Sequence, residues 1–397
     1  MSSTHKKGIN CMKKKSLWAW GLVLGGAASI ALGGAWLYKR SKMISTWAQH
    51  PQGGLVKTAY GTFIVQEQVI LELLESPAMK RIKKVNHYGA RHFVEEKPQV
   101  YTRYEHCVGV WAILRRFGAT LEEQIAGLLH DASHTVFSHV GDWVFKGTNQ
   151  GDSYQDDVHA WYLKKSGVPA ILANYNIALE QVLPKSGAHS MLEQDLPDLC
   201  ADRIEYNLRG GILTGMLNQK DVDDLLNVLY YERGTWFFAN ATLAKKFSLV
   251  SLYHSENVWG AKHMYILDRF TAKALKRAFE IGLVTKDEVH FSVDDEVWQK
   301  LEQSNDPHVK ECITAMRNVQ KWYALVHPRQ GEAVINAKFR GVNPWVQQQD
   351  GSMKRLTEID PEYAREYNRV KEQVTKGWGV KFVNNVFKDG KKVPQWV

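Results

Sequence analysis

Residues 126–139 read AGLLHDASHTVFSH, and this stretch decides the fold that we expect. It continues an apolar pattern that recurs at the spacing of one helix face. We therefore predict a helix over 121–134, on which His130 and His134 stand one turn apart on the same face. Asp131 is turned by about 100° from His130 on such a helix, and its carboxylate can still reach the same centre.

The donor groups in this stretch indicate a metal centre. Imidazole and carboxylate ligands together suit a divalent ion such as Mn, Fe, Zn or Ni. A site with three or four protein ligands keeps coordination positions for water and for a substrate oxygen, as hydrolytic metal sites do. The sequence therefore predicts one divalent metal ion as cofactor, with Mn, Fe, Zn, Ni and Mg as the candidates.

The composition is that of a globular protein. The 397 residues are 44% hydrophobic and 23% charged. Of the net charge of +9, eight basic residues and no acid lie in residues 1–43, so the rest of the chain carries about +1. Long nucleic acids are therefore disfavoured as partners. The four cysteines are scattered without a C-x-x-C pair, which predicts neither a zinc ribbon nor a disulfide framework.

The N-terminus divides into a basic tail, residues 1–16, and an uncharged segment, residues 17–38. The uncharged segment is long enough to cross a bilayer as a helix, with Trp and Tyr near its ends. We expect a membrane anchor, and a cleaved secretory signal is the alternative. Basic residues flank the segment on both sides, so the side of the membrane stays open, with a weak preference for a cytoplasmic N-terminus.

The remaining sequence predicts two regions. Residues 55–285 are mainly helical, with helices over 104–117, 155–165, 192–209 and 240–282. Residues 286–397 predict a small mixed α/β region, with alternating strands near 334–342 and 378–387 and a polar helix at 360–376. The expected fold class is mostly α, with a helical core, a C-terminal α/β region and an N-terminal transmembrane or signal helix.

Three stretches resemble motifs of the HD-domain metal-dependent phosphohydrolases, whose metal ligands follow the order H…HD…D. GTFIVQEQVILELLESPAMKRIKKVNHYGA, at 61–90, is similar to the opening segment of the branch that contains the dNTP triphosphohydrolases. TRYEHCVGV, at 102–110, resembles that branch's N/T-R-x-E-H-x-x-G-V motif, and AGLLHDASHTVFSH resembles its A-G-L-x-H-D-x-x-H-x-x-F-S-H motif. The resemblance covers about residues 55–280. It implies an HD domain over 55–285 that hydrolyses a phosphate ester or anhydride.

Carried over by position, the resemblance implies a set of metal ligands: His106, His130, Asp131 and Asp202. It implies three catalytic histidines, of which the first two face the phosphates, one orienting and one protonating the leaving oxygen: His134, His139 and His159. It also implies two substrate contacts, one to a phosphate and one lining the pocket: Arg103 and Tyr206.

Two positions depart from the pattern of this branch. Ala160 stands where the branch usually has Glu, and Gly210 stands where it often has an Asp near the sugar. The absence of the acid at 210 puts a nucleoside triphosphate substrate in question, but not metal-dependent hydrolysis. We expect a nucleotide or another phosphorylated small molecule as the ligand. The oligomeric state stays open, with a homo-oligomer as one candidate. The alternatives are a catalytically degenerate, membrane-anchored nucleotide sensor and a phosphodiesterase.

Residues outside the motifs carry simpler expectations. Three histidines without motif support are predicted at the surface: His87, His92 and His189. Three tryptophans are predicted in the core rather than as platforms for a base: Trp143, Trp161 and Trp259.

Overall fold

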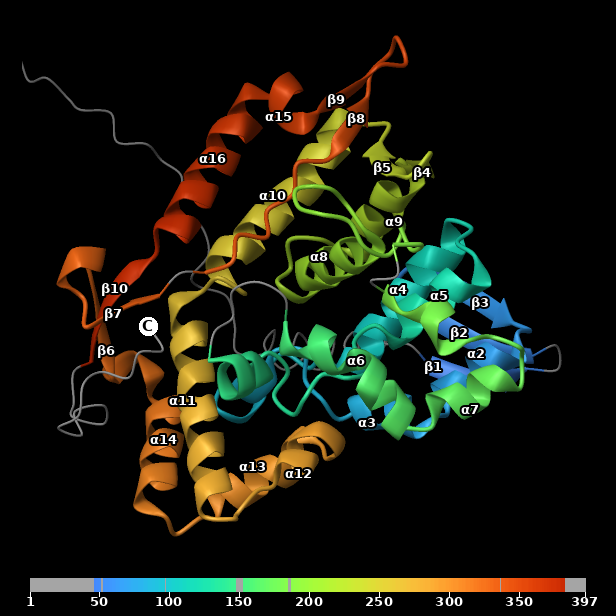
Figure 1. Cartoon of the computed structure of the whole chain (residues 1–397). Coiled ribbons are helices and arrows are strands. Elements are labelled where there is room, and N and C mark those ends of the chain that lie inside the picture. Colours follow the sequence, from blue (N-terminus) through green and yellow to red (C-terminus); the bar gives the residue numbers. More distant parts are fainter. Residues whose placement is uncertain are drawn as a thin grey trace, which may run out of the picture. The chain divides into compact units, whose positions relative to one another are not determined.

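The computed structural model describes residues 46–50, 53–96, 98–147, 153–184, 187–335 and 337–382 (Figure 1). Residues Met43–Val397 form one compact unit, in which helices predominate. The predicted domain boundary at 285/286 falls inside this unit, between α11 (Lys262–Glu280) and α12 (Lys286–Phe291). The predicted segments 1–16 and 17–38 lie outside the described residues. Within the described ranges, no helix combines the length and the apolar character that a bilayer span needs.

The described chain begins with an antiparallel meander of three strands: β1 (Thr46–His50), β2 (Gly53–Thr58) and β3 (Gly61–Val65). Two short helices follow: α2 (Gln68–Leu74) and α3 (Pro77–Ile82). The Ser76 side chain accepts a hydrogen bond from the Met79 N–H, and Pro77 occupies the first turn of α3, where a missing N–H costs no hydrogen bond. Sequence reasoning did not predict the meander.

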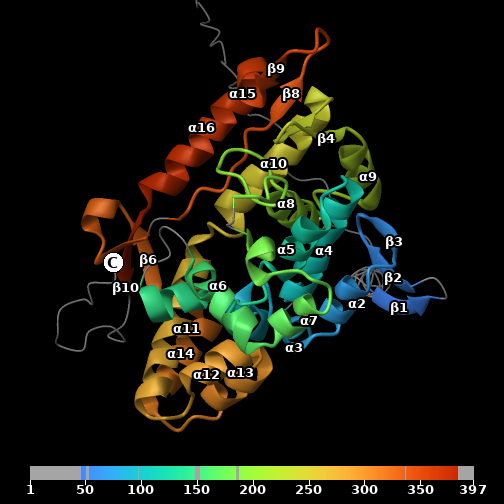
Figure 2. The same ribbon diagram turned by 45° about the vertical axis from the view of Figure 1, so that its right-hand side comes forward.

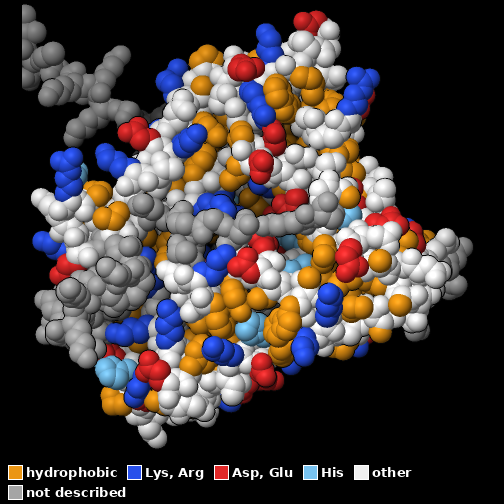
Figure 3. All heavy atoms as spheres, viewed as in Figure 1, with side chains coloured by type: hydrophobic (Ala, Val, Ile, Leu, Met, Phe, Trp, Pro, Cys, Tyr) orange, Lys and Arg blue, Asp and Glu red, His pale blue; other side chains and the backbone are white. Residues whose placement is uncertain are grey.

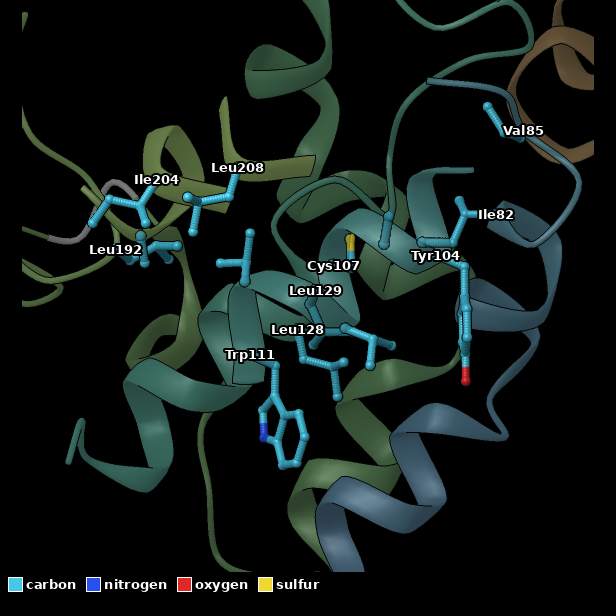
Figure 4. Close-up of a cluster of buried hydrophobic side chains, with 14 of the residues drawn as sticks. Ile82, Val85, Tyr104, Cys107, Trp111, Leu128, Leu129, Leu192, Ile204 and Leu208 are labelled. Atoms are coloured by element: carbon cyan, nitrogen blue, oxygen red, sulfur yellow. The ribbon is translucent and has the colours of Figure 1, made fainter. Parts of the chain in front are cut away.

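Three helices form the centre of the HD region: α4 (Arg103–Arg116), α5 (Leu121–Leu129) and α8 (Ala201–Leu213). Helix α4 contacts both of the others and begins at a capping box formed by Thr102 and Glu105. Figure 4 shows part of the buried apolar cluster of this region, including Trp111, Leu128, Leu129, Ile204 and Leu208. Burial of these side chains holds the three helices in fixed relative positions.

Three predicted helices have different bounds in the structure. The helix predicted over 121–134 ends at Leu129. Beyond it, the His130 carbonyl accepts a hydrogen bond from the Gln155 side chain, and the Ala132 and His134 carbonyls accept from Arg81, rather than from helical N–H groups. The helix predicted over 192–209 begins only at Ala201, since Pro197 has no N–H to offer a helix. The stretch 240–282 forms two helices, α10 (Ala241–Asn257) and α11, separated by a turn.

The predictions for 104–117 and 155–165 agree with the structure to within one residue, as α4 and α6 (Tyr154–Lys165). The other described helices are α7 (Val168–Ala173), α9 (Gln219–Asn227), α13 (Asp294–Glu302), α14 (Pro307–Arg317) and α15 (Leu356–Ile359). Shorter turns of 3₁₀ helix are η1 (Gly89–Phe93), η3 (Leu179–Val182), η5 (Val319–Lys321) and η6 (Pro328–Gln330), and η2 (Asp142–Lys146) is a π turn.

The C-terminal region is mixed α/β, as predicted. One sheet has the order β6-β10-β7: β6 (Tyr323–Val326), β10 (Trp378–Phe382) and β7 (Ala333–Ile335). The other has the order β4-β5-β8-β9: β4 (Leu229–Glu232), β5 (Thr235–Phe238), β8 (Trp345–Gln347) and β9 (Met353–Arg355). Because β8 pairs in parallel with β5, the C-terminal region shares a sheet with the helical region.

The predicted C-terminal helix is present as α16 (Pro361–Lys376), which lies beside α10 in both ribbon views (Figures 1 and 2). The strand predicted over 334–342 is shorter, because residues after 336 bond to the helical region rather than to a strand. The Lys338 N–H meets the Tyr265 hydroxyl at 3.1 Å, and the Asn343 N–H meets the Pro197 carbonyl at 3.0 Å. On the face drawn in Figure 3, basic and acidic side chains are interspersed.

Candidate metal centre

Three predicted ligands converge from three helices. His106 comes from the first turns of α4, His130 caps the C-terminus of α5, and Asp202 lies in the first turn of α8. His106 Nε2 is 3.1 Å from His130 Nε2 and 2.8 Å from Asp202 Oδ1, and the third separation, His130 Nε2 to Asp202 Oδ1, is 3.6 Å. Ligands bonded to one ion at about 2.0–2.2 Å lie roughly 3.0–3.6 Å apart. These donor atoms therefore fit one metal ion.

The opposite ring nitrogens of both histidines have partners that fix the rings. His130 Nδ1 donates to the Gly127 carbonyl at 2.8 Å, and His106 Nδ1 meets the carboxylate of Glu205. Metal-binding histidines commonly donate their second N–H to a carbonyl or carboxylate, which leaves the other nitrogen free to ligate. The orientation of both imidazole rings therefore fits a bound metal ion.

Glu205 is a buried member of the centre that sequence reasoning missed. Its carboxylate also accepts hydrogen bonds from the Tyr101 hydroxyl and from the Tyr60 hydroxyl, the latter at 2.8 Å. A side chain at Gly109 would collide with it, since a Cβ there would lie 2.4 Å from Glu205 Oε1. The signal was available, because Glu205 stands one helical turn after Asp202.

Asp131 lies on another side of the two histidines. Its carboxylate oxygens are 3.6 Å from His106 Nε2 and 3.6 Å from His130 Nε2. It also forms a buried ion pair with Arg103 and contacts His134 Nε2 at 3.2 Å. Burial opposes ionisation of this carboxyl, but Arg103 and then the neighbouring histidines hold its pKa well below its usual range. Asp131 is therefore available as an anionic ligand.

The structure corrects the predicted relation between His130 and His134. They do not share a helix face, because α5 ends at Leu129 and the chain turns at 130–133. His134 nonetheless reaches the centre through its contact with Asp131. A second turn follows, in which Phe137 and Ser138 adopt positive φ values of 59° and 56°. Two hydrogen bonds stabilise it: the Phe137 N–H donates to Asp294 at 2.7 Å, and Arg103 Nε donates to the Ser138 hydroxyl at 3.0 Å.

The other two predicted catalytic histidines occupy different surroundings. His139 follows the turn, its ring 5.0 Å from that of His134, and its side chain is 42% exposed and 3.4 Å from Asp142. His159 on α6 is buried, and its Nδ1 is 2.8 Å from the Ser133 hydroxyl. Its Nε2 has no hydrogen-bond partner among the described residues. Burial, and then the proximity of His130, lower the pKa of His159 to about 4, so its ring is neutral.

Aromatic rings extend from the centre to Tyr206. Trp259 lies edge-on to Tyr206 at 5.5 Å and stacks on Tyr88 at 5.9 Å, and His87 lies 6.3 Å from it. We call these four residues the aromatic wall: His87, Tyr88, Tyr206 and Trp259. Within the described part of the chain, the Tyr88 hydroxyl and Trp259 Nε1 are buried without hydrogen-bond partners.

Two of the surface and core predictions are wrong. His189 is 4% exposed and so is not a surface residue, and Trp161 is 40% exposed and so is not in the core. His87, which lies beside His106, and His92 are both partly exposed, whereas Trp143 is buried and Trp259 packs against a buried apolar cluster, as predicted. No local pattern signals these placements, because they follow from which helices meet.

Comparison with known proteins agrees with the fold and with a metal-dependent phosphohydrolase. The description "HD domain" matches residues 103–206, a range that contains all nine predicted site residues. Protein YdhJ of Bacillus subtilis, which is uncharacterised, is 34% identical over 257 residues, 62% of this chain and 75% of its own. The metal-dependent phosphohydrolase cns2 of Cordyceps militaris is 33% identical over 262 residues, 64% of this chain and 74% of its own.

Two solved structures share the fold. A hypothetical protein from Aquifex aeolicus has a TM-score of 0.58 and 17% identity, covering 81% of this chain and 93% of its own. A phosphohydrolase from Bacteroides thetaiotaomicron has a TM-score of 0.57 and 14% identity, covering 85% of this chain and 100% of its own. The chain belongs to the HD-domain family of metal-dependent phosphohydrolases. It is a hydrolase whose cofactor is a divalent metal ion.

Proposed function

We propose that this enzyme hydrolyses a phosphate ester or anhydride of a nucleotide, in the manner of the dNTP triphosphohydrolases. The observation that carries the proposal is the aromatic wall next to the metal ligands. Stacking of a base on an aromatic side chain is worth about 1–3 kcal/mol and tolerates any base. The buried Tyr88 hydroxyl and Trp259 Nε1 supply hydrogen-bonding groups for a polar ring or a sugar.

The residues around the centre divide the chemical work. His106, His130, Asp131 and Asp202 would hold the divalent ion, which when bound activates a water and polarises a phosphoryl oxygen. Arg103 pairs with Asp131 through Nη1, while its Nη2 is buried without a partner among the described residues and suits a phosphate oxygen.

The two histidines of the turn take different roles in this proposal. His134 is held by Asp131, so it orients that carboxylate and the phosphate beside it. His139 is more exposed, and its Nδ1 lies 3.4 Å from the carboxylate of Asp142, which suits a residue that gives a proton to the leaving oxygen.

One contact favours a substrate other than a triphosphate as the second candidate. A Cβ at Gly210 would lie 2.5 Å from His254 Cε1, so the His254 ring fills the space that an acid at position 210 would need. Because the dNTP triphosphohydrolase branch often has that acid, its loss favours another phosphorylated substrate, such as a nucleoside monophosphate or a cyclic nucleotide. The released product distinguishes these candidates.

The test is an assay of the full chain, purified in mild detergent with Mn²⁺, against dNTPs, NTPs, nucleoside monophosphates, cyclic nucleotides and generic phosphoesters. Asp131→Asn should lower turnover at least ~100-fold by removing an anionic ligand. The exposed Asp350→Asn is the matched control. Tripolyphosphate as product supports the triphosphohydrolase form, and orthophosphate or a nucleoside monophosphate supports the second candidate. Metal and nucleotide binding without turnover would contradict the proposal and favour a sensor.

A further inference from the structure

The histidine turn, residues 134–139, has a backbone that needs support from other segments. These residues belong to no helix or strand, so no regular ladder of hydrogen bonds fixes them. Phe137 and Ser138 both adopt positive φ values, which cost free energy in residues that carry a Cβ. Because the turn carries His134 and His139, its backbone decides where both imidazoles lie relative to the centre.

The support comes from α12 and α13, which lie outside the range that matches the HD domain. The Val136 N–H donates to the Val289 carbonyl at 2.9 Å, in the last turn of α12, where carbonyls lack helical partners. The Phe137 N–H donates to one carboxylate oxygen of Asp294 at 2.7 Å, in the first turn of α13. Both helices therefore bind the backbone of the histidine turn directly.

Asp294 also ties the histidine turn to the segment before α4. Its second carboxylate oxygen accepts from the Asn86 N–H at 2.7 Å and from Asn86 Nδ2 at 3.3 Å. The Asn86 carbonyl in turn accepts from the Ser138 hydroxyl at 2.5 Å. Asp294 thus closes a ring of hydrogen bonds with Phe137, Ser138 and Asn86. The carboxylate is fully buried, so water cannot replace these donors if the ring is broken.

The ring reaches the metal centre through Arg103. Arg103 Nε donates to the Ser138 hydroxyl at 3.0 Å, and Nη1 of the same guanidinium pairs with the Asp131 carboxylate at 2.5 Å. Asp294 therefore acts on the centre by two routes. One is the backbone that carries the two histidines, and the other is the guanidinium of Arg103.

We propose that Asp294 is a positioning residue for hydrolysis, which fixes the histidine turn and Arg103 relative to the phosphate. The proposal rests on the roles of His139 and Arg103 in the proposed function. Misplacement of a reacting group by about 1 Å can cost ~100-fold in rate. The ligands on α4, α5 and α8 keep their own partners when Asp294 is changed, so turnover depends on Asp294 far more than metal affinity does.

The test compares Asp294→Asn with two other variants of α13. An amide has one acceptor oxygen, so it can hold only one of the two backbone N–H groups that the carboxylate holds. Asp295→Asn makes the same change at the exposed neighbouring position and controls for the lost charge. Leu301→Ala removes a buried apolar side chain from the last turns of α13 and controls for lost stability.

Hydrogen exchange of the full chain, followed by mass spectrometry, reports on the turn without a substrate. Exchange of a peptide that covers 132–140 should be at least ~10-fold faster in Asp294→Asn and unchanged in Asp295→Asn. In Leu301→Ala, exchange should rise in α13 and not specifically in the turn. This measurement tests whether Asp294 holds the turn.

Turnover of the most rapidly hydrolysed phosphoester of the panel, together with Mn²⁺ affinity, tests the consequence. In Asp294→Asn, kcat should fall at least ~10-fold while Mn²⁺ affinity stays within about threefold of the wild type. Both controls should keep kcat within about threefold. If Asp294→Asn does not fold, Asp294→Ser, whose smaller side chain keeps one acceptor, repeats both measurements.

Exchange of the turn at the wild-type rate in Asp294→Asn would overturn the proposal. A kcat that falls no further than in Leu301→Ala would also overturn it, since Asp294 would then contribute only stability. If the wild type hydrolyses nothing in the panel, the proposed function fails, whereas hydrogen exchange still decides whether Asp294 holds the turn. The two failures are therefore distinguishable.

Discussion

Two sets of residues around the metal centre differ in whether their polar groups have hydrogen-bond partners. We call the set around His106, His130 and Glu205 the inner side, and the set formed by Arg103, His159, Tyr88 and Trp259 the outer side. On the inner side, His106 and His130 each have a partner for the second ring nitrogen, and Glu205 accepts from Tyr60 and Tyr101. On the outer side, Arg103 Nη2, His159 Nε2, the Tyr88 hydroxyl and Trp259 Nε1 are buried without partners within the described ranges. A fully hydrogen-bonded network fixes the orientation of the metal-binding side chains, whereas buried polar groups without partners can hydrogen-bond to a bound substrate.

The same contrast appears in the pKa values of the histidines. Burial opposes protonation of His106, but Glu205 and then Asp202 outweigh it and raise the pKa to about 10. Burial alone dominates at His254, which packs on Gly210, and lowers its pKa to about 4. The two histidines thus differ in their neighbouring carboxylates, which outweigh burial at His106, whereas burial prevails at His254.

The largest expected effect is on the pH dependence of metal affinity. His106 holds a proton below a pH of about 10, and the ion must displace it. Affinity should therefore rise with pH, by up to about tenfold per unit between roughly pH 6 and 8. Titration of the metal-free chain with Mn²⁺ at several pH values checks this. A metal affinity that stays constant or falls as the pH rises would contradict this prediction.

Glu205→Gln should weaken metal affinity about 10–100-fold, because the amide no longer holds the charge that orients His106. The pH dependence of affinity should also become shallower, since Glu205 is what raises the pKa of His106 most. The same titration measures both effects. Glu180→Gln, at an exposed site, is the control. If both variants bind the metal equally well, Glu205 does not contribute to metal binding.

Gly210→Ala should destabilise the fold by about 1–3 kcal/mol, because the new methyl group meets the His254 ring. Urea unfolding measures the change. The double variant Gly210→Ala/His254→Ala should lose less unfolding free energy than the two single variants lose in sum, since the smaller side chain at 254 leaves room for the methyl group. Additive costs would show that the ring is not the obstacle.

The smallest effects compare two tyrosines across the centre. Tyr88→Phe removes a hydroxyl without a described partner, so stability should change by less than about 0.5 kcal/mol. Tyr101→Phe removes a donor to Glu205 and should cost about 1–3 kcal/mol. Thermal melting of both variants tests the difference. If the Tyr88 hydroxyl meets the substrate, KM should rise a few-fold in Tyr88→Phe while kcat is retained.

The sequence by itself determined the chemistry of the centre and two of the helices around it. Histidine and aspartate at the positions of the H…HD…D motif specify a divalent metal, and the capped, periodic segments of α4 and α6 fix their own bounds locally. The polar helix α16 and the strand β10 that follows it also came from local periodicity and alternation.

Only the tertiary structure decided which other residues join the centre. His87, Glu205 and Trp259 reach it because an extended segment, α8 and the turn after α10 meet there. The turn at 130–139 likewise depends on Arg81 and Asp294, which are distant in sequence. Local periodicity reports which face of one element is apolar, whereas these contacts depend on how separate elements pack together.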